Sequence, residues 1–490
     1  MFSFSTIEEY HTFLAVNPEG CTIAVNHYLS RIDAHKHLNS FLEVYAEEAL
    51  QKAMLLDEKR KSGQPLGKLH GVVIALKDVI SYQGHKLSAA SNILGNFTAI
   101  YNATVVEKLL AEEAIIIGRN NCDEFAMGST NENSFYGNVL NARDQARVPG
   151  GSSGGSAVAV QAGLCMASLG SDTGGSVRQP ADFCGILGLK PSYGKVSRYG
   201  LIAYASSFDQ IGIFGTSVPD VAKVLEVIAG EDDFDSTVSP AAVSNSTPQE
   251  PPIPQEFPFS HEPSTRKYRI AYFKEALAHP GLDPEIRTTI EGYIQQLQEA
   301  GHTVQPIDFE LLDYIVPAYY ILTTAEASSN LSRFDGVRYG YRAADPDLEL
   351  TEFYKRSRSE GFGKEVKRRI LLGTFVLSAG YYDAYFTKAQ QVRKMLTDRT
   401  TLIFNDFDII ILPTSPTTAF PIGEKMGDPI AMYLADIYTV YANLVGIPGI
   451  SIPLFTHTNG MPFGIQAMTN RFNELSLLQF SHQMMQHYKS

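Results

Sequence analysis

The sequence predicts an α/β fold, with a sheet covered by helices. From Leu69 onward, short apolar segments alternate with stretches of helical periodicity. An amphipathic helix is predicted over 284–300, with Asp283 as its N-cap and Gly301 directly after its end. The alternation is typical of a sheet with helices packed on it. The segments that we expect to be strands are 72–76, 114–117, 268–273 and 409–412.

Two segments differ from this alternating pattern. Residues 1–63 are predicted to be helical, with one helix over 46–61, and to pack on the rest of the chain as scaffolding. Residues 235–265 are rich in Pro and Ser and have no periodicity, which predicts an extended, exposed segment. From the residues alone, this second segment is either a linker between domains or a surface loop within one domain.

Composition narrows the class of protein. A chain of 490 residues with 44% hydrophobic and 19% charged residues can bury a sizeable core. Its net charge of −13 makes it a poor candidate for gripping a phosphate backbone by itself. We expect a cytoplasmic protein without a membrane span or a metal site, because no long apolar segment, basic leader or HExxH spacing is present. Buried free thiols are expected at Cys21, Cys122, Cys165 and Cys184.

The motif that carries chemistry is a pair of glycine-serine turns. Residues 150–156 read GGSSGGS and residues 170–176 read GSDTGGS. Such tracts are often flexible linkers, but the apolar segments that follow indicate that these glycines lie in a core. Free amides in the turns could hold phosphate, although neither GxxxxGK[ST] nor GxGxxG is present. Alternatively, Ser176 is a nucleophile and an oxyanion hole is formed by the amides of Thr173, Gly174, Gly175 and Ser176.

A nucleophilic hydroxyl needs a base, and Lys77 is the candidate. It follows five consecutive apolar residues, 72–76, which predict a strand buried on both faces. Burial disfavours the ammonium form and lowers the pKa of a lysine, as a general base requires. The alternative is a surface lysine paired with Asp78. The strand pattern alone leaves both interpretations open.

Together these motifs resemble the amidase signature family. Its hallmark is a lysine in a GxPxxxKD-like strand, then GGSSGG, then GxDxGGSxRxP; here Ser152 and Ser176 are 24 residues apart (176 − 152), and Val73 replaces the proline. The resemblance implies a relay through an acyl-enzyme, with Ser176 as nucleophile, Ser152 as bridging serine and Lys77 as base. It also implies a cis peptide bond between Gly151 and Ser152, and a large mixed β-sheet covered on both faces by helices.

The second half resembles, more narrowly, the family of A subunits of glutamyl-tRNA(Gln) amidotransferases. Because the resemblance resumes beyond the Pro/Ser-rich segment, we expect a single domain over residues 1–490, with residues 235–265 as a surface loop. The resembling segments are 327–340, 359–370, 378–385 and 443–451.

This narrower resemblance implies a glutaminase that works in a heterotrimer with subunits B and C. The chain would hydrolyse glutamine and bind no cofactor itself. Its ammonia would serve a partner subunit, which uses ATP and Mg²⁺ to convert glutamate mischarged on tRNA(Gln) into glutamine. The alternative is a free-standing amidase that acts on other small amides.

Glutamine carries a free α-carboxylate and a free α-ammonium, so its pocket needs a cation and an anion. The resemblance implies that Arg369 binds the carboxylate, Asp436 binds the ammonium and Tyr320 lines the pocket. The choice of Arg369 over Arg368 depends on the register, and the alternative is a charge on the helix surface. Supporting roles around the nucleophile are expected for Asp172, Arg178 and Asp209.

Overall fold

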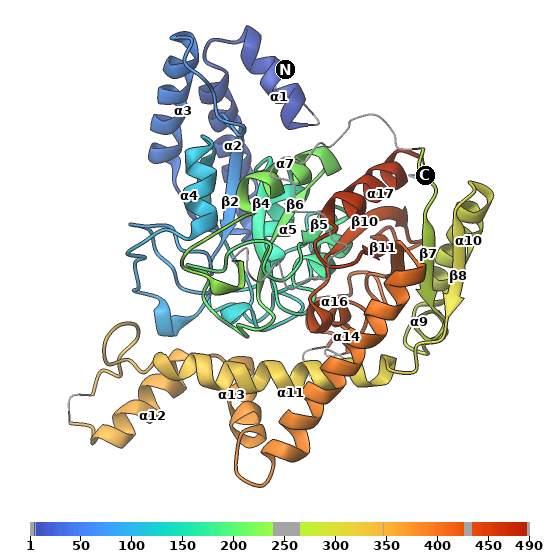
Figure 1. The fold of residues 1–490 in the computed structure, drawn as a ribbon. Coiled ribbons are helices and arrows are strands. Elements are labelled where there is room, and N and C mark those ends of the chain that lie inside the picture. Colours follow the sequence, from blue (N-terminus) through green and yellow to red (C-terminus); the bar gives the residue numbers. More distant parts are fainter. Residues whose placement is uncertain (1–3, 5, 239–264, 346, 426–433, 488–490) are drawn as a thin grey trace.

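The chain folds as an α/β protein in a computed structural model (Figure 1). No helix within the described ranges is both long and apolar enough to cross a membrane. Most of the expected surface loop, residues 239–264, lies outside those ranges. The structure describes residues 4, 6–238, 265–345, 347–425 and 434–487.

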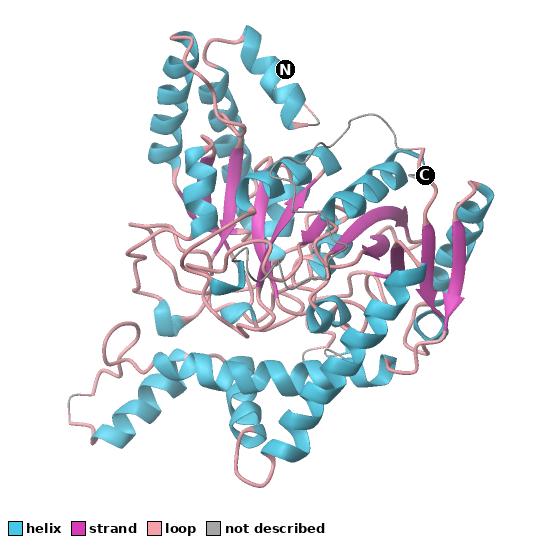
Figure 2. Cartoon of the chain, in the orientation of Figure 1, coloured by secondary structure: helices cyan, strands magenta, loops and turns pink. Residues whose placement is uncertain are grey.

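Eleven strands form one mixed sheet, drawn as arrows in Figure 2. Their spatial order is β1 (Phe41–Val44), β3 (Ile115–Asn120), β2 (Val73–Lys77), β4 (Ala167–Asp172), β6 (Gln210–Gly215), β5 (Leu187–Lys190), β10 (Gly449–Thr456), β11 (Pro462–Met468), β9 (Ile409–Pro413), β7 (Arg269–Phe273) and β8 (Thr303–Ile307). β2 is parallel to both β3 and β4, and β7 is parallel to both β8 and β9. The other neighbours are antiparallel.

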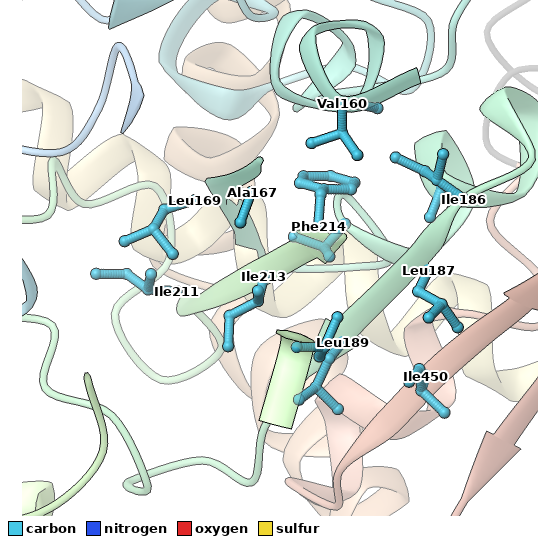
Figure 3. Packing of buried hydrophobic residues seen from close by; sticks show 14 of the residues in the cluster. Val160, Ala167, Leu169, Ile186, Leu187, Leu189, Ile211, Ile213, Phe214 and Ile450 are labelled. Atoms are coloured by element: carbon cyan, nitrogen blue, oxygen red, sulfur yellow. The ribbon is translucent and has the colours of Figure 1, made fainter. Parts of the chain in front are cut away.

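Helices cover both faces of this sheet. In Figure 3, Val160 lies over the ring of Phe214 in β6, which places α5 on that face. The next residue, Gly215, faces the other way, and a side chain there would meet Val221 of α7. The helices are α1 (Ile7–Val16), α2 (Gly20–Ala34), α3 (Ala46–Lys61), α4 (Thr104–Ala111), α5 (Gly154–Gln161), α6 (Arg178–Cys184), α7 (Val218–Ile228), α9 (Lys274–Ala278), α10 (Pro284–Glu299), α11 (Leu312–Asn330), α12 (Leu350–Gly361), α13 (Lys364–Val376), α14 (Lys388–Asp406), α16 (Val440–Val445) and α17 (Glu474–His487).

The elements predicted from the sequence are confirmed, with small shifts at their ends. The four expected strands correspond to β2, β3, β7 and β9, and α3 covers residues 46–61 as predicted. The carboxylate of Asp283 caps α10 by accepting the first backbone N–H groups of the helix. The strand β1 was missed in a segment expected to be helical only. Its four residues are too few to show a period, and its antiparallel pairing with β3 fixes it in place.

A further group of helices lies across the carboxyl end of β4. Figure 1 shows α11 running below the sheet, with α12, α13 and α14 beside it. α11 packs against both α13 and α14. Tyr319 of α11 comes so close to Gly174, two residues after β4, that a side chain at Gly174 would collide with its ring. The helical group therefore closes the end of the sheet where the glycine-serine turns lie.

Candidate active site

Lys77 is the last residue of β2, and its side chain is fully buried. The strand is buried at every position, as its apolar pattern predicted, so the ammonium group cannot reach solvent. Its Nζ instead donates hydrogen bonds to three serine hydroxyls. The distances are 2.7 Å to Ser152 Oγ, 2.8 Å to Ser153 Oγ and 2.9 Å to Ser171 Oγ.

This burial decides between the two interpretations of the lysine. Removal from water disfavours the charged form and lowers the pKa of Lys77 to about 8. Asp78, the partner in the surface interpretation, pairs instead with Arg119, with 2.6 Å between the carboxylate and the guanidinium. Lys77 is therefore a buried amine with a lowered pKa in contact with Ser152.

Ser152 is held by the backbone around the first glycine-serine turn. The Gly151–Ser152 peptide bond is cis, as the family resemblance implied. The carbonyl of Ser152 accepts the N–H of Asp123 at 3.0 Å, and the N–H of Gly151 donates to Gln179 Oε1 at 3.0 Å. A side chain at Gly151 would collide with the carboxylate of Asp123, so only glycine fits.

Ser176 lies between β4 and α6 and is 8% exposed, whereas Lys77 and Ser152 are fully buried. The order of exposure places Ser176 nearest to an incoming substrate. Within the described ranges, the Ser176 hydroxyl donates and accepts no hydrogen bond, so the link between Ser152 and Ser176 is not formed. Hydrogen bonds of this kind tighten when substrate fills the site.

The structure removes one of the four amides that were predicted to form the oxyanion hole. The N–H of Gly175 donates to Asp172 Oδ1 at 2.8 Å, because the buried carboxylate needs donors and the turn wraps around it. That N–H is therefore not available to a substrate. The N–H groups of Gly174 and Ser176 donate no hydrogen bond to other described residues. Thr173, Gly174 and Ser176 remain as the candidate donors.

The second turn requires its two glycines. Gly175 has a φ of +118°, which side chains rarely adopt. Thr439 packs directly against Gly175, and its hydroxyl donates to the carbonyl of Gly174 at 2.8 Å. Tyr319 packs against Gly174 from α11. Contacts on both sides therefore fix the shape of the turn around Ser176.

Asp172 and Arg178, which were expected to support the nucleophile, form an ion pair with 3.0 Å between Oδ1 and the guanidinium. Burial by itself would raise the pKa of Asp172, but the Arg178 charge and its hydrogen bonds lower that pKa below the usual range. Arg178 also donates to the carbonyl of Thr439 at 2.8 Å, to Asn443 Oδ1 at 2.6 Å and to the Gln466 side chain. The pair thus anchors the nucleophile turn to the residue before α16, to α16 itself and to β11.

Asp209 supports the same turn from the other side. Its carboxylate accepts the Thr173 hydroxyl at 2.7 Å and the N–H of Tyr204 at 2.9 Å. Burial raises the pKa of Asp209 to about 7. The contact with Thr173 gives Asp209 a position consistent with the expected supporting role.

At the other end of the site, Asp436 and Tyr320 are in contact. The Tyr320 hydroxyl donates to Asp436 Oδ2 at 3.0 Å, and the Ser129 hydroxyl donates to the same oxygen at 2.8 Å. Burial raises the pKa of Asp436 to about 6, and these two hydrogen bonds oppose the rise. Ser129 was not foreseen, since its segment shows no motif.

Arg369 is the arginine of α13 that points inward. Its side chain is 3% exposed, whereas that of Arg368 is 38% exposed. The Arg369 guanidinium lies 5.4 Å from the ring centre of Tyr320 and donates to the Tyr204 hydroxyl at 2.8 Å. Both arginines pair with Glu365 on the same helix. The structure therefore brings a buried cation next to the tyrosine that contacts Asp436.

The mixed sheet, with a buried lysine hydrogen-bonded to serines of a glycine-rich turn, defines the class of amidases. The family model described as Amidase matches residues 24–478. The chain therefore belongs to the amidase family. The match extends across all eleven strands and into α17.

Within that family, the chain is similar over its whole length to A subunits of glutamyl-tRNA(Gln) amidotransferases. The subunit from Chlorobium phaeobacteroides is 49% identical over 484 residues, which cover 99% of each chain. That from Koribacter versatilis is 50% identical, with 94% of each chain covered. The crystal structure of the Thermotoga maritima subunit has a TM-score of 0.78 at 35% identity and covers 98% of this chain and 94% of that one. The peptide amidase of Stenotrophomonas maltophilia has a TM-score of 0.77 at 26% identity, with 96% and 94% covered.

Proposed function

We propose that this chain is the glutaminase subunit of a tRNA-dependent amidotransferase, which supplies ammonia for converting Glu-tRNA(Gln) into Gln-tRNA(Gln). The observation that carries the proposal is the pairing of two features in one site. One is the buried Lys77 in contact with Ser152, and the other is the buried cation Arg369 near the carboxylate of Asp436. A plain aliphatic amide needs only the first feature, whereas glutamine needs both.

The reaction begins with proton transfer through the serines. Neutral Lys77 takes the proton of Ser152, which takes the proton of Ser176 as the Ser176 oxygen attacks the amide carbonyl. The oxyanion that forms is stabilised by backbone N–H groups of the second turn. The protons then return through the same groups to the leaving ammonia, and water hydrolyses the acyl-enzyme with the same base.

Recognition of glutamine uses the opposite end of the site. Arg369 binds the α-carboxylate through charge-assisted hydrogen bonds, and Asp436 binds the α-ammonium. Tyr320 forms the wall between them and holds the Asp436 carboxylate through its hydroxyl. The pKa of about 6 for Asp436 leaves this carboxylate ionised at neutral pH, which suits a cationic ligand.

The chain acts in the cytoplasm as part of a heterotrimer with subunits B and C. ATP and Mg²⁺ bind at the partner subunit, which activates the mischarged glutamate on tRNA(Gln), and this chain needs no cofactor of its own. Its net charge of −13 supports this division, because a polyanionic tRNA is then held by the partner. The A-subunit names of the relatives support the assembly.

The proposal is tested by ammonia release from glutamine. The chain is co-expressed with its partner subunits, and the wild type is compared with Ser176→Ala, with a simple aliphatic amide as a second substrate. We expect glutamine turnover that is lost in Ser176→Ala and little turnover of the aliphatic amide. Rapid hydrolysis of the aliphatic amide with glutamine ignored would contradict the proposal and indicate a free-standing amidase.

A further inference from the structure

The three hydroxyls around Lys77 are more than the proton relay requires. An ammonium group has three N–H donors, whereas a neutral amine has two donors and one lone pair. The Ser153 hydroxyl donates to the carbonyl of Ser171 at 3.1 Å and accepts the N–H of Ser171 at 3.3 Å. With its proton engaged there, Ser153 can only accept from Lys77, at 2.8 Å. One N–H of Lys77 therefore donates to Ser153 whether the lysine is charged or neutral.

The direction of the second N–H depends on whether the Ser171 hydroxyl accepts a hydrogen bond from Lys77 or donates one. Its Oγ lies 2.9 Å from Lys77 Nζ and bonds no other group in the described part of the chain. If Ser171 accepts, the lone pair of the neutral amine is left facing Ser152, 2.7 Å away. If Ser171 donates instead, an N–H faces Ser152 and the amine cannot take its proton.

We propose that Ser171, together with Ser153, is a positioning residue that aims the lone pair of Lys77 at Ser152 and then holds the ammonium that forms. In the transfer, the O–H bond of Ser152 breaks and an N–H bond forms on Lys77. The ammonium then directs its three N–H groups at the three serine oxygens. This inference deepens the proposed function, because it concerns the base of that same reaction.

A substitution at Ser171 changes none of the other groups that act on Lys77. They come from three different parts of the sheet and raise the pKa of Lys77 against the larger effect of burial. A difference between variants at position 171 therefore reports the hydroxyl and not a changed charge. These groups are Cys122 and Asp123 after β3, Asp172 at the end of β4 and Asp209 before β6.

The test is the pH dependence of glutamine hydrolysis by Ser171→Ala in the co-expressed assembly. Loss of an acceptor destabilises the ammonium, so the acidic limb of the rate profile should move to lower pH by about one unit. We expect kcat to fall about tenfold, since the amine is both less basic and free to turn. KM should stay unchanged, because Ser171 does not touch the ends of glutamine. Ser171→Thr, which keeps the hydroxyl, should restore both values.

Ser168→Ala is the matched control. Ser168 is buried on the same strand, and its hydroxyl donates to the carbonyl of Ser156 at 2.8 Å, away from Lys77. Its profile should match the wild type. If Ser171→Ala does not fold, Ser153→Ala removes the other accepting hydroxyl and should move the limb in the same direction.

An acidic limb that stays in place in a folded Ser171→Ala or Ser153→Ala would overturn the inference. A fall in kcat with an unmoved limb and a lower melting temperature would show a structural role only. Both outcomes leave the proposed function intact as long as the wild type hydrolyses glutamine and Ser176→Ala does not. Absence of glutamine turnover in the wild type would instead contradict the proposed function.

Discussion

The two ends of the site are built in different ways. The reacting end, around Lys77 and Ser152, is assembled on the sheet from strand ends and two turns close together in the sequence. The recognition end comes from α11, α13 and the loop before α16, and the hydrogen bond from Ser129 to Asp436 joins residues 307 positions apart. Under the proposed function, the difference teaches that the chemistry would rest on the framework of the family, whereas the helical group would supply the choice of substrate.

The two ends also use burial in opposite ways. Burial lowers the pKa of Lys77 to about 8, which provides a neutral amine, and raises that of Asp436 to about 6, which leaves an anion needing a partner. The first group works without a substrate charge. The second is held by the Tyr320 and Ser129 hydroxyls and is stabilised further when a cation binds beside it. Variants at the reacting end should therefore affect every amide, and variants at the recognition end should affect glutamine.

The largest effect is expected from Lys77→Ala. Loss of the base should lower turnover about a thousandfold on both glutamine and a simple aliphatic amide, because both need the same proton transfer. Ammonia release measures the loss, and circular dichroism checks the fold. Near-normal turnover, or a loss confined to glutamine, would break the comparison by showing that Lys77 is not the common base.

Arg369→Ala should impair the recognition end of the site and leave the reacting end intact. Removing the buried cation leaves the α-carboxylate of glutamine unpaired, which should lower kcat/KM for glutamine about a hundredfold. The simple amide carries no carboxylate and should be little affected. Arg368→Ala is the control, since that side chain is 38% exposed on the same helix. Equal losses on both substrates would remove Arg369 from the carboxylate site.

The pH dependence of the two substrates should diverge in acid. Lys77 must be neutral, so kcat/KM for both substrates should fall about tenfold per pH unit below about pH 8. Asp436 must be ionised for glutamine only, and it becomes protonated below about pH 6. Below that pH the glutamine profile should therefore steepen to about a hundredfold per unit, while the amide profile keeps its slope. Parallel profiles would contradict the role of Asp436.

The reacting end was largely predictable from the sequence because its residues lie in short motifs. The strand before Lys77, the turn at Ser152 and the turn at Ser176 are local features, and each was found where predicted. Ser171 was overlooked although it lies inside the second motif. A hydroxyl in a fully buried strand needs a partner, and that rule could have identified it.

The recognition end could not be derived from the residues alone. Asp436, Tyr320 and Arg369 were assigned only through the family resemblance, because their contacts depend on how α11 and α13 pack over the sheet. Ser129 gave no signal at all, for the same reason. The engagement of the Gly175 N–H by Asp172 was likewise invisible, since a sequence does not show which way a turn directs each amide.

The smallest effect is expected from Tyr320→Phe. The change removes one of the two hydroxyls that donate to Asp436 Oδ2 and keeps the aromatic wall. KM for glutamine should rise about fivefold, the usual cost of one hydrogen bond, with kcat unchanged. The hydroxyl stabilises the ionised carboxylate, so its loss should raise the pKa of Asp436 above about 6 and move the steep acidic limb to higher pH.

Tyr314→Phe on the same helix is the control, since Tyr314 is 56% exposed and makes no hydrogen bond to Asp436. The aliphatic amide should be hydrolysed equally by both variants and the wild type, because it does not use the Asp436 carboxylate. An unmoved limb in Tyr320→Phe would mean that the Tyr320 hydroxyl does not influence the ionisation of Asp436. A loss shared by both substrates would instead place Tyr320 at the reacting end. The helix α11 would then contribute to the reaction as well as to recognition.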